Sequence, residues 1–110
     1  MADKITAAQL TRRASFLRAI EEVDEDGMIV QGWRVQFTCA AHVHYLRGSE
    51  AIMQARLQSR SPAIVTVRDF PAARAITSEW RCQIDGRTFE CKEDPRPDQA
   101  RRILEMLVEG

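Results

Sequence analysis

The side chains of this sequence best suited to chemistry are its three cysteines and two histidines. Cys82 and Cys91 flank an Asp-Gly pair in the stretch WRCQIDGRTFECKED, and the histidines stand one residue apart as His42 and His44. Thiolates and imidazoles are zinc ligands, and a thiol beside an imidazole forms a nucleophile with its base. A metal site, a disulfide, a redox pair and a thiol enzyme are therefore the hypotheses. The predicted strands that carry these residues decide which of them is geometrically possible.

The Asp-Gly pair predicts a β-hairpin, because a type I′ turn needs positive φ at both of its central residues. A two-residue turn sets Cys82 opposite Phe89 and Trp80 opposite Cys91, so both cysteines lie on one apolar face together with Ile84. The cysteines are then diagonal neighbours with Cα atoms about 7 to 8 Å apart, too far for an unstrained disulfide. We interpret both as small buried hydrophobic side chains.

The histidines fall in WRVQFTCAAHVHY, which alternates as a long half-buried strand does. Its predicted core face carries Trp33, Val35, Phe37, Cys39, Ala41, Val43 and Tyr45. The histidines lie on the opposite face, where no third metal ligand is evident because the cysteines point to the core. Cys39 and His42 likewise face opposite ways, which argues against a catalytic pair. No catalytic, cofactor-binding or metal site is predicted, and the chain is not expected to be an enzyme.

The length and charge of the chain bear on how it folds, on its partners and on where it is made. With 110 residues the chain is long enough to bury a core without metals or disulfides. Its net charge of zero does not select nucleic acid or an anionic membrane as partner. The N-terminus lacks the apolar core of a signal peptide, and no apolar run approaches the about 20 residues of a membrane span. The protein is therefore expected to be made in the cytoplasm.

The other segments suggest strands with one inserted helix. Ser49 is a natural N-cap for a short helix in RGSEAIMQARLQSR, and AIVTVRDF predicts a further strand. The two ends of the chain fit a helix or a strand equally. The acidic stretch EEVDEDGMIVQG, with a turn at Asp26-Gly27, lacks the ligand pattern of an EF-hand and is interpreted as a solvated loop. Together these elements favour a small antiparallel barrel or sandwich.

The order of these features resembles the phage head-tail joining proteins, also called head-closure or stopper proteins. The resemblance extends from about Arg12 to Glu109 and rests on RRASFLRAIEE, DEDGMIVQGW, LRGSEAIMQAR, VTVRDF and ITSEWRCQIDGRTFECKEDPRPDQARRILEMLVE. Each motif is weak alone, and their combination is far more specific. The sequence departs from the family in the extra residues of DFPAARAI and in Cys91, where an aliphatic residue is usual.

The resemblance implies one domain over residues 1–110, a mainly β fold built as a small antiparallel β-barrel of about six strands. Residues 1–11 would form an N-terminal extension. Residues 47–61 would form a loop with one short helix, inserted between the second and third strands. Both ends of the domain would be strands, over residues 13–21 and 102–108.

The resemblance also implies a structural virion component at the head-tail connector. The protein would form a ring of about twelve copies beneath the portal or its adaptor ring and would close the DNA exit channel after packaging. It would offer a docking surface to the tail terminator or tail tube protein. Non-specific contact with the end of the packaged DNA is expected. The resemblance implies no membrane partner, no cofactor and no catalysed reaction.

Interfaces are expected on the protruding segments, because binding residues favour loops held on a rigid scaffold. The predicted interface residues are Arg47, Glu50, Gln54, Arg56, Arg68, Asp24 and Asp26. Two alternatives remain open. One is the portal-proximal adaptor of the same connector, and the other is a stand-alone OB-like or SH3-like barrel that binds nucleic acid or peptide.

Overall fold

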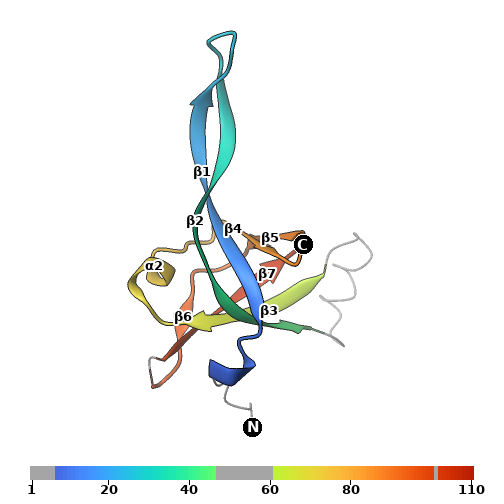
Figure 1. The fold of residues 1–110 in the computed structure, drawn as a ribbon, viewed down its shortest axis with the longest axis vertical. Coiled ribbons are helices and arrows are strands. Elements are labelled where there is room, and N and C mark those ends of the chain that lie inside the picture. The colour runs from blue at the N-terminus through green and yellow to red at the C-terminus, as the bar shows by residue number, and fades with distance from the viewer. Residues whose placement is uncertain (1–6, 47–60, 101) are drawn as a thin grey trace.

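The chain folds into one antiparallel sheet that closes on itself (Figure 1). The structure, a computed structural model, describes residues 7–46, 61–100 and 102–110. The strands pair in the order β3-β2-β1-β4-β5-β7-β6, and an additional pairing of β3 with β7 closes the ring. The elements are η1 (Ala7–Gln9), β1 (Arg12–Val23), β2 (Ile29–Tyr45), β3 (Pro62–Arg68), α2 (Pro71–Arg74), β4 (Arg81–Ile84), β5 (Arg87–Cys91), β6 (Arg96–Pro97) and β7 (Ile103–Glu109).

The predicted mainly β, antiparallel fold class is confirmed. The two terminal segments that the family resemblance implied to be strands are β1 and β7, and the short 3-10 helix η1 precedes β1. The ring itself consists of β1 to β5 and β7, while the two-residue β6 pairs only with β7. The helix predicted within residues 47–61 falls almost wholly on residues 47–60, outside those that the structure describes.

The hairpin of β4 and β5 has the predicted register. Cys82 pairs with Phe89 across a turn in which Asp85 has φ 52° and Gly86 has φ 78°. The predicted apolar face lies inside the ring, with Cys82 fully buried and Cys91 only 2 % exposed. Both cysteines are free thiols and belong to the hydrophobic core.

A bulge in β2 overturns part of the predicted core face. Phe16 of β1 pairs with Phe37, but its neighbour Leu17 pairs with Val35, which leaves Gln36 as an extra residue. One extra residue inverts the alternation of side chains beyond it. Phe37 therefore stacks on Phe16 with ring centroids 5.2 Å apart, whereas Val35 is 50 % exposed. The prediction that Trp33 and Val35 share the core face of Phe37 is wrong. Tyr45, at the end of the strand, is also more exposed than predicted, at 46 %.

The segment interpreted as an acidic loop is mostly strand. β1 pairs with β4 only through Ala14 to Leu17, yet its pairing with β2 continues to Val23 opposite Ile29. Residues 18–35 therefore leave the ring as a two-stranded extension, here called the ribbon, which rises from the rest of the molecule in Figure 1. At about 3.3 Å per residue, the ribbon projects about 20 Å and so contributes a large part of the 55 Å length of the molecule.

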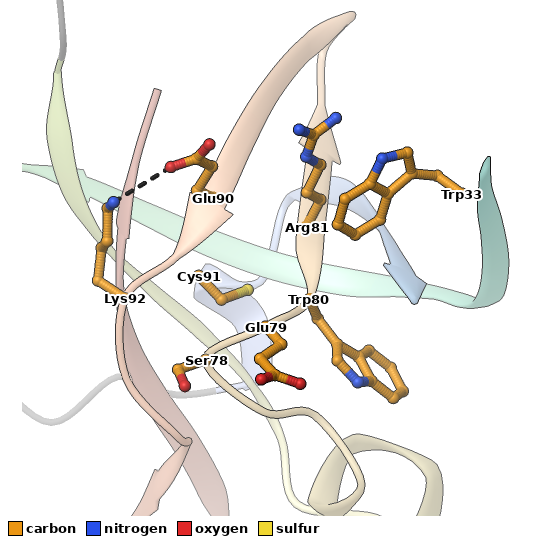
Figure 2. Close-up of a pocket in the computed structure, with 8 residues that line it drawn as sticks. All are labelled: Trp33, Ser78, Glu79, Trp80, Arg81, Glu90, Cys91 and Lys92. Atoms are coloured by element: carbon orange, nitrogen blue, oxygen red, sulfur yellow. Dashed lines mark hydrogen bonds and ion pairs between the residues drawn. The ribbon is translucent and has the colours of Figure 1, made fainter. Parts of the chain in front are cut away.

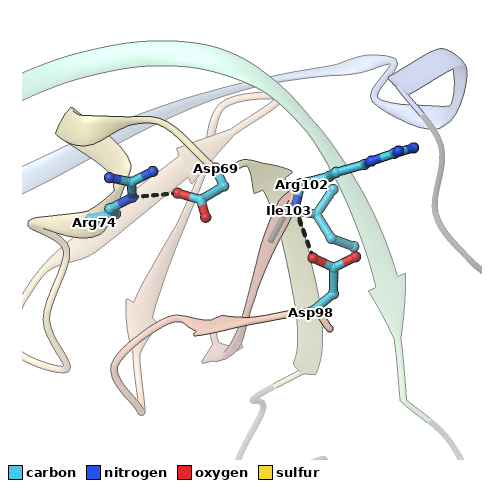
Figure 3. A network of polar contacts seen from close by, with 5 residues as sticks. All are labelled: Asp69, Arg74, Asp98, Arg102 and Ile103. Carbon is cyan, nitrogen blue, oxygen red and sulfur yellow. Dashed lines mark hydrogen bonds and ion pairs between the residues drawn. The ribbon is translucent and has the colours of Figure 1, made fainter. Parts of the chain in front are cut away.

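The connection after β3 contains a short helix that the sequence did not predict. Pro71 occupies its first turn, where the missing N–H costs nothing. The helix is tied to β3 by Arg74, whose Nε lies 2.6 Å from the buried carboxylate of Asp69 (Figure 3). Nearby, the carboxylate of Asp98 accepts hydrogen bonds from the backbone N–H groups of Arg102, at 2.8 Å, and Ile103. The backbone N–H of Asp69 also donates to the carbonyl oxygen of Arg102 at 2.9 Å, so these contacts hold the end of β3 beside the start of β7.

Candidate interaction surface

The cysteines do not form a reactive site. Burial raises the pKa of Cys91 to about 12 and that of Cys39 to about 11, and the charge of Arg13 only partly opposes the shift at Cys39. Burial also raises the pKa of Cys82, with smaller contributions from the two other thiols. Nucleophilic attack needs the thiolate. At neutral pH all three side chains are therefore protonated and inert.

The histidines do not assemble a metal site with other ligands in the described part of the chain. His42 and His44 lie on β2 opposite Thr66 and Ile64 of β3. Residues 7–46, 61–100 and 102–110 contain no group of three or more His, Cys, Asp or Glu side chains placed to hold a metal ion. Nor does a helix in these ranges have the length and apolar character to cross a membrane.

The turn that joins the two strands of the ribbon is organised by Asp24. Its Oδ1 accepts hydrogen bonds from the backbone N–H groups of Asp26, at 3.0 Å, and Met28, at 2.8 Å. The backbone of Asp24 also pairs with that of Met28, and Gly27 supplies the positive φ, 79°, that the turn requires. Asp24, predicted as an interface residue, thus shapes the turn that Asp26 belongs to.

Large apolar side chains are exposed at this end of the ribbon. Val23, Met28 and Ile29 are 71 %, 64 % and 69 % exposed, and Val30 is 40 % exposed. Val23 and Ile29 are cross-strand partners, so their side chains form a continuous patch. We call residues 21–31 the ribbon tip. Clustered exposed apolar side chains mark interaction sites, whereas single ones are ordinary.

The apolar patch lies within a strongly acidic segment. Five carboxylate residues fall between Arg18 and Arg34, with no basic residue among them: Glu21, Glu22, Asp24, Glu25 and Asp26. All five are exposed. In a chain of zero net charge this places a local negative field around the apolar side chains. The ribbon tip therefore combines the two properties that select a protein partner, apolar area and directed charge.

The base of the ribbon is fixed to the ring by an aromatic contact. The guanidinium carbon of Arg81 on β4 lies 4.1 Å from the ring centroid of Trp33 on β2. Figure 2 shows this pair on one side of a hollow of about 250 Å³, with Lys92 and Glu90 on the other. Lys92 is paired with Glu90 at 3.1 Å, so these two charges balance each other. A second hollow, beside Arg18 and Ala19, lies at the other strand of the ribbon.

The predicted interface residues do not form one cluster in the described structure. Asp24 and Asp26 are in the ribbon tip, while Arg68 ends β3 opposite Ile103, in the ring. The remaining four, Arg47, Glu50, Gln54 and Arg56, lie outside the described residues. The sequence interpretation missed the apolar residues of the tip. The signal was present in the run Met28-Ile29-Val30, which follows the Asp-Gly turn directly and is too apolar for a solvated loop.

Comparison with known proteins identifies relatives of the whole chain. The family model described as phage head completion protein matches residues 5–109. The fold is similar to the solution structure of protein SF1141 from Shigella flexneri 2a, with a TM-score of 0.68 and 22 % identity over 94 % of this chain and 95 % of that one. It is also similar to a chain in the virion of a native gene transfer agent particle, with a TM-score of 0.61 and 20 % identity over 90 % and 92 % of the two chains. No curated protein matches the sequence.

Proposed function

This chain belongs to the phage head completion protein family, and from this premise we propose that it forms a ring at the head-tail connector that closes the DNA exit channel after packaging. Membership makes the chain a structural component of the virion. The proposal adds its position beneath the portal or its adaptor ring, its ring of about twelve copies, and its role as the docking surface for the tail.

The single observation that carries the proposal is the ribbon with its exposed apolar tip. The described strands close into a ring, and a long arm held away from that ring is suited to reach another protein of the assembly. The similarity in fold to a chain of the gene transfer agent virion supports the same conclusion. Members of such an assembly act by contact, so their function lies in surfaces rather than in a pocket.

A closed ring needs a heterologous interface, in which two different patches of one subunit meet those of its neighbours. Arg68, which ends β3 in the ring, is proposed as part of such a patch. Asp24 and Asp26 on the ribbon tip are proposed as part of the surface that meets a partner protein of the connector. From the sequence pattern, we assign Arg47, Glu50, Gln54 and Arg56 to the same role.

The predominance of strands favours the closure ring over the adaptor, because adaptors are predominantly helical. A stand-alone nucleic-acid reader of the OB type would need exposed aromatic side chains along a basic groove. Phe16, Phe37 and Phe89 instead pack in or against the core. Tyr45 is the most exposed aromatic side chain among the described residues, and it lies against Phe89 with ring centroids 6.4 Å apart.

Electron cryo-microscopy of complete particles tests the proposed position. We expect density of this fold as a ring between the portal complex and the first tail component, with the ribbon of each copy resolved. Density for the fold elsewhere in the particle, such as on the capsid lattice or at the distal end of the tail, would contradict the assignment. Mass spectrometry that counts about twelve copies per particle provides an independent check.

A further inference from the structure

We propose that the ribbon tip docks into an apolar groove rimmed by lysine and arginine side chains on a different protein of the virion. The inference rests on the proposed function and names the chemistry of one partner. The chemistry of this partner follows from three features of the described surface. These are the exposed apolar area of the ribbon tip, the sign of the charge around it, and the absence of a matching groove among the described residues of this chain.

The apolar area defines the kind of contact. Val23, Met28 and Ile29 are each more than three-fifths exposed, and two of them are direct cross-strand partners. Apolar side chains at the centre of an interface, once water is excluded, provide most of the binding free energy. Figure 1 shows that the two strands end in a narrow projecting turn, a shape that is complementary to a groove rather than to a flat surface.

The charge defines the rim of that groove. The ribbon tip carries five carboxylate residues and no basic residue, so a partner with acidic residues around its groove would be repelled. Lysine and arginine side chains at the rim would pair with Glu25 and Asp26, which lie between Val23 and Met28 in the sequence. Charges at the rim of an interface set its specificity and association rate more than its final affinity.

The ribbon tip is also preorganised for binding. Asp24 closes the turn with two side-chain hydrogen bonds, and Arg81 stacks on Trp33 at the base of the ribbon. A segment that is already ordered loses less conformational entropy when it binds.

A second copy of this chain is a poorer partner. Outside the ribbon, the described residues include one large exposed hydrophobic side chain, Tyr45, which lies beside Phe89 and 6.0 Å from the guanidinium of Arg87. The two hollows at the ribbon base are lined by both acidic and basic side chains, including Glu79 in each. Neither surface offers an apolar groove with a basic rim.

Photo-crosslinking in assembled particles tests the partner directly. A photoreactive phenylalanine analogue replaces Met28, whose side chain is 64 % exposed, and the altered protein complements a strain that lacks the gene. After irradiation of purified particles, we expect a crosslink to another virion protein at a segment that contains apolar residues beside lysine or arginine. Crosslinks only between copies of this chain, or only to DNA, would overturn the proposal.

Matched variants test the energetics. The triple variant Val23→Ser, Met28→Ser, Ile29→Ser removes the patch without touching the core, and Val35→Ser alters a half-exposed residue of the same ribbon outside the tip. Circular dichroism should show that both remain folded. We expect the triple variant to reduce the protein retained on purified particles about 10-fold or more, and Val35→Ser to leave it unchanged. Wild-type retention of the triple variant would overturn the proposal.

Charge reversal separates the two parts of the docking surface. The variant Glu25→Lys, Asp26→Lys should also reduce retention, and raising the salt concentration should weaken the wild-type contact and not the variant's. Identical salt dependence of the two would contradict the basic rim. The strain lacking the gene distinguishes failure of this inference from failure of the proposed function. If that strain makes heads without tails and the triple variant restores tail attachment fully, only the docking surface is refuted.

Discussion

At the scale of single residues, environment decides what each reactive group can do. The thiols of Cys82 and Cys91 lie in the core beside Phe89 and Trp80, and the exchange of Cys91 for an aliphatic residue would preserve that environment. Their identity as core residues could be predicted from the sequence, because a two-residue Asp-Gly turn determines which residues face each other. Charge and apolar area are concentrated instead at the ribbon tip.

The first prediction concerns stability at alkaline pH. The pKa of Cys91 is about 12 in the folded protein, above its ordinary value of 9.0. Below that ordinary value the thiol is neutral in both states and has no pH-dependent effect. As the pH rises further, the unfolded state loses the proton first, so stability falls until the folded pKa is passed.

Cys91→Val should therefore be less sensitive to alkaline pH than the wild type. In that window the slope of unfolding free energy against pH should be shallower by at most about 1.4 kcal/mol per pH unit, the effect of one proton. Urea unfolding at pH 7 and at several values above 9.0 measures it, and the pH 7 data separate the change in packing. Parallel pH profiles for the two proteins would show that Cys91 does not titrate as described.

At the scale of elements, features set by neighbouring residues could be predicted from the sequence, and features set by distant strands could not. The β4–β5 hairpin follows from Asp85-Gly86 alone, since its register is determined within a few residues. The bulge at Gln36 is defined by pairing with β1, a distant segment, and no residue type near Gln36 predicts it. The same limitation hid the ribbon, because Glu21 and Glu22 look like loop residues until the partner strand is known. In α2, by contrast, Pro71 was a local signal that was overlooked.

The second prediction tests the hairpin turn. A Cβ at Gly86 would meet nothing within 4 Å, so Gly86→Ala changes only the conformational preference at φ 78°. The left-handed conformation costs a non-glycine residue about 1 to 2 kcal/mol, and the free energy of unfolding in urea should fall by that amount. Thr88→Ala, an exposed change in the same hairpin, serves as the control and should cost less. Equal stability of Gly86→Ala and wild type would refute the type I′ turn.

The third prediction concerns the attachment of the ribbon. Trp33→Ala removes the ring on which Arg81 stacks, a contact worth about 0.5 to 1 kcal/mol at an exposed site. Backbone amides of the ribbon should exchange with deuterium about 2- to 5-fold faster, while the ring of strands stays protected. Arg81→Ala should have the same effect, and the double variant should add little. Additive effects of the two changes would show that the side chains act separately.

At the scale of the whole molecule, a closed ring of strands carries a projecting two-stranded arm. The ring has a small buried core and few exposed apolar side chains, so among the described residues the ribbon is the prominent surface for contact. Fold class and family were accessible from the sequence, because the order of strands and turns extends over the whole chain. The projection of the ribbon beyond the ring was not, because it depends on a bulge and on pairing with a distant strand, although the run Met28-Ile29-Val30 signalled its apolar tip.

Electron microscopy of particles made without this protein tests whether the chain closes the head and receives the tail. If the chain closes the head and receives the tail, the producing strain should accumulate heads without tails, filled with DNA or emptied by leakage. Supplying the wild-type gene in trans should restore tailed, infectious particles. Intact tailed particles in the absence of the protein would contradict the account.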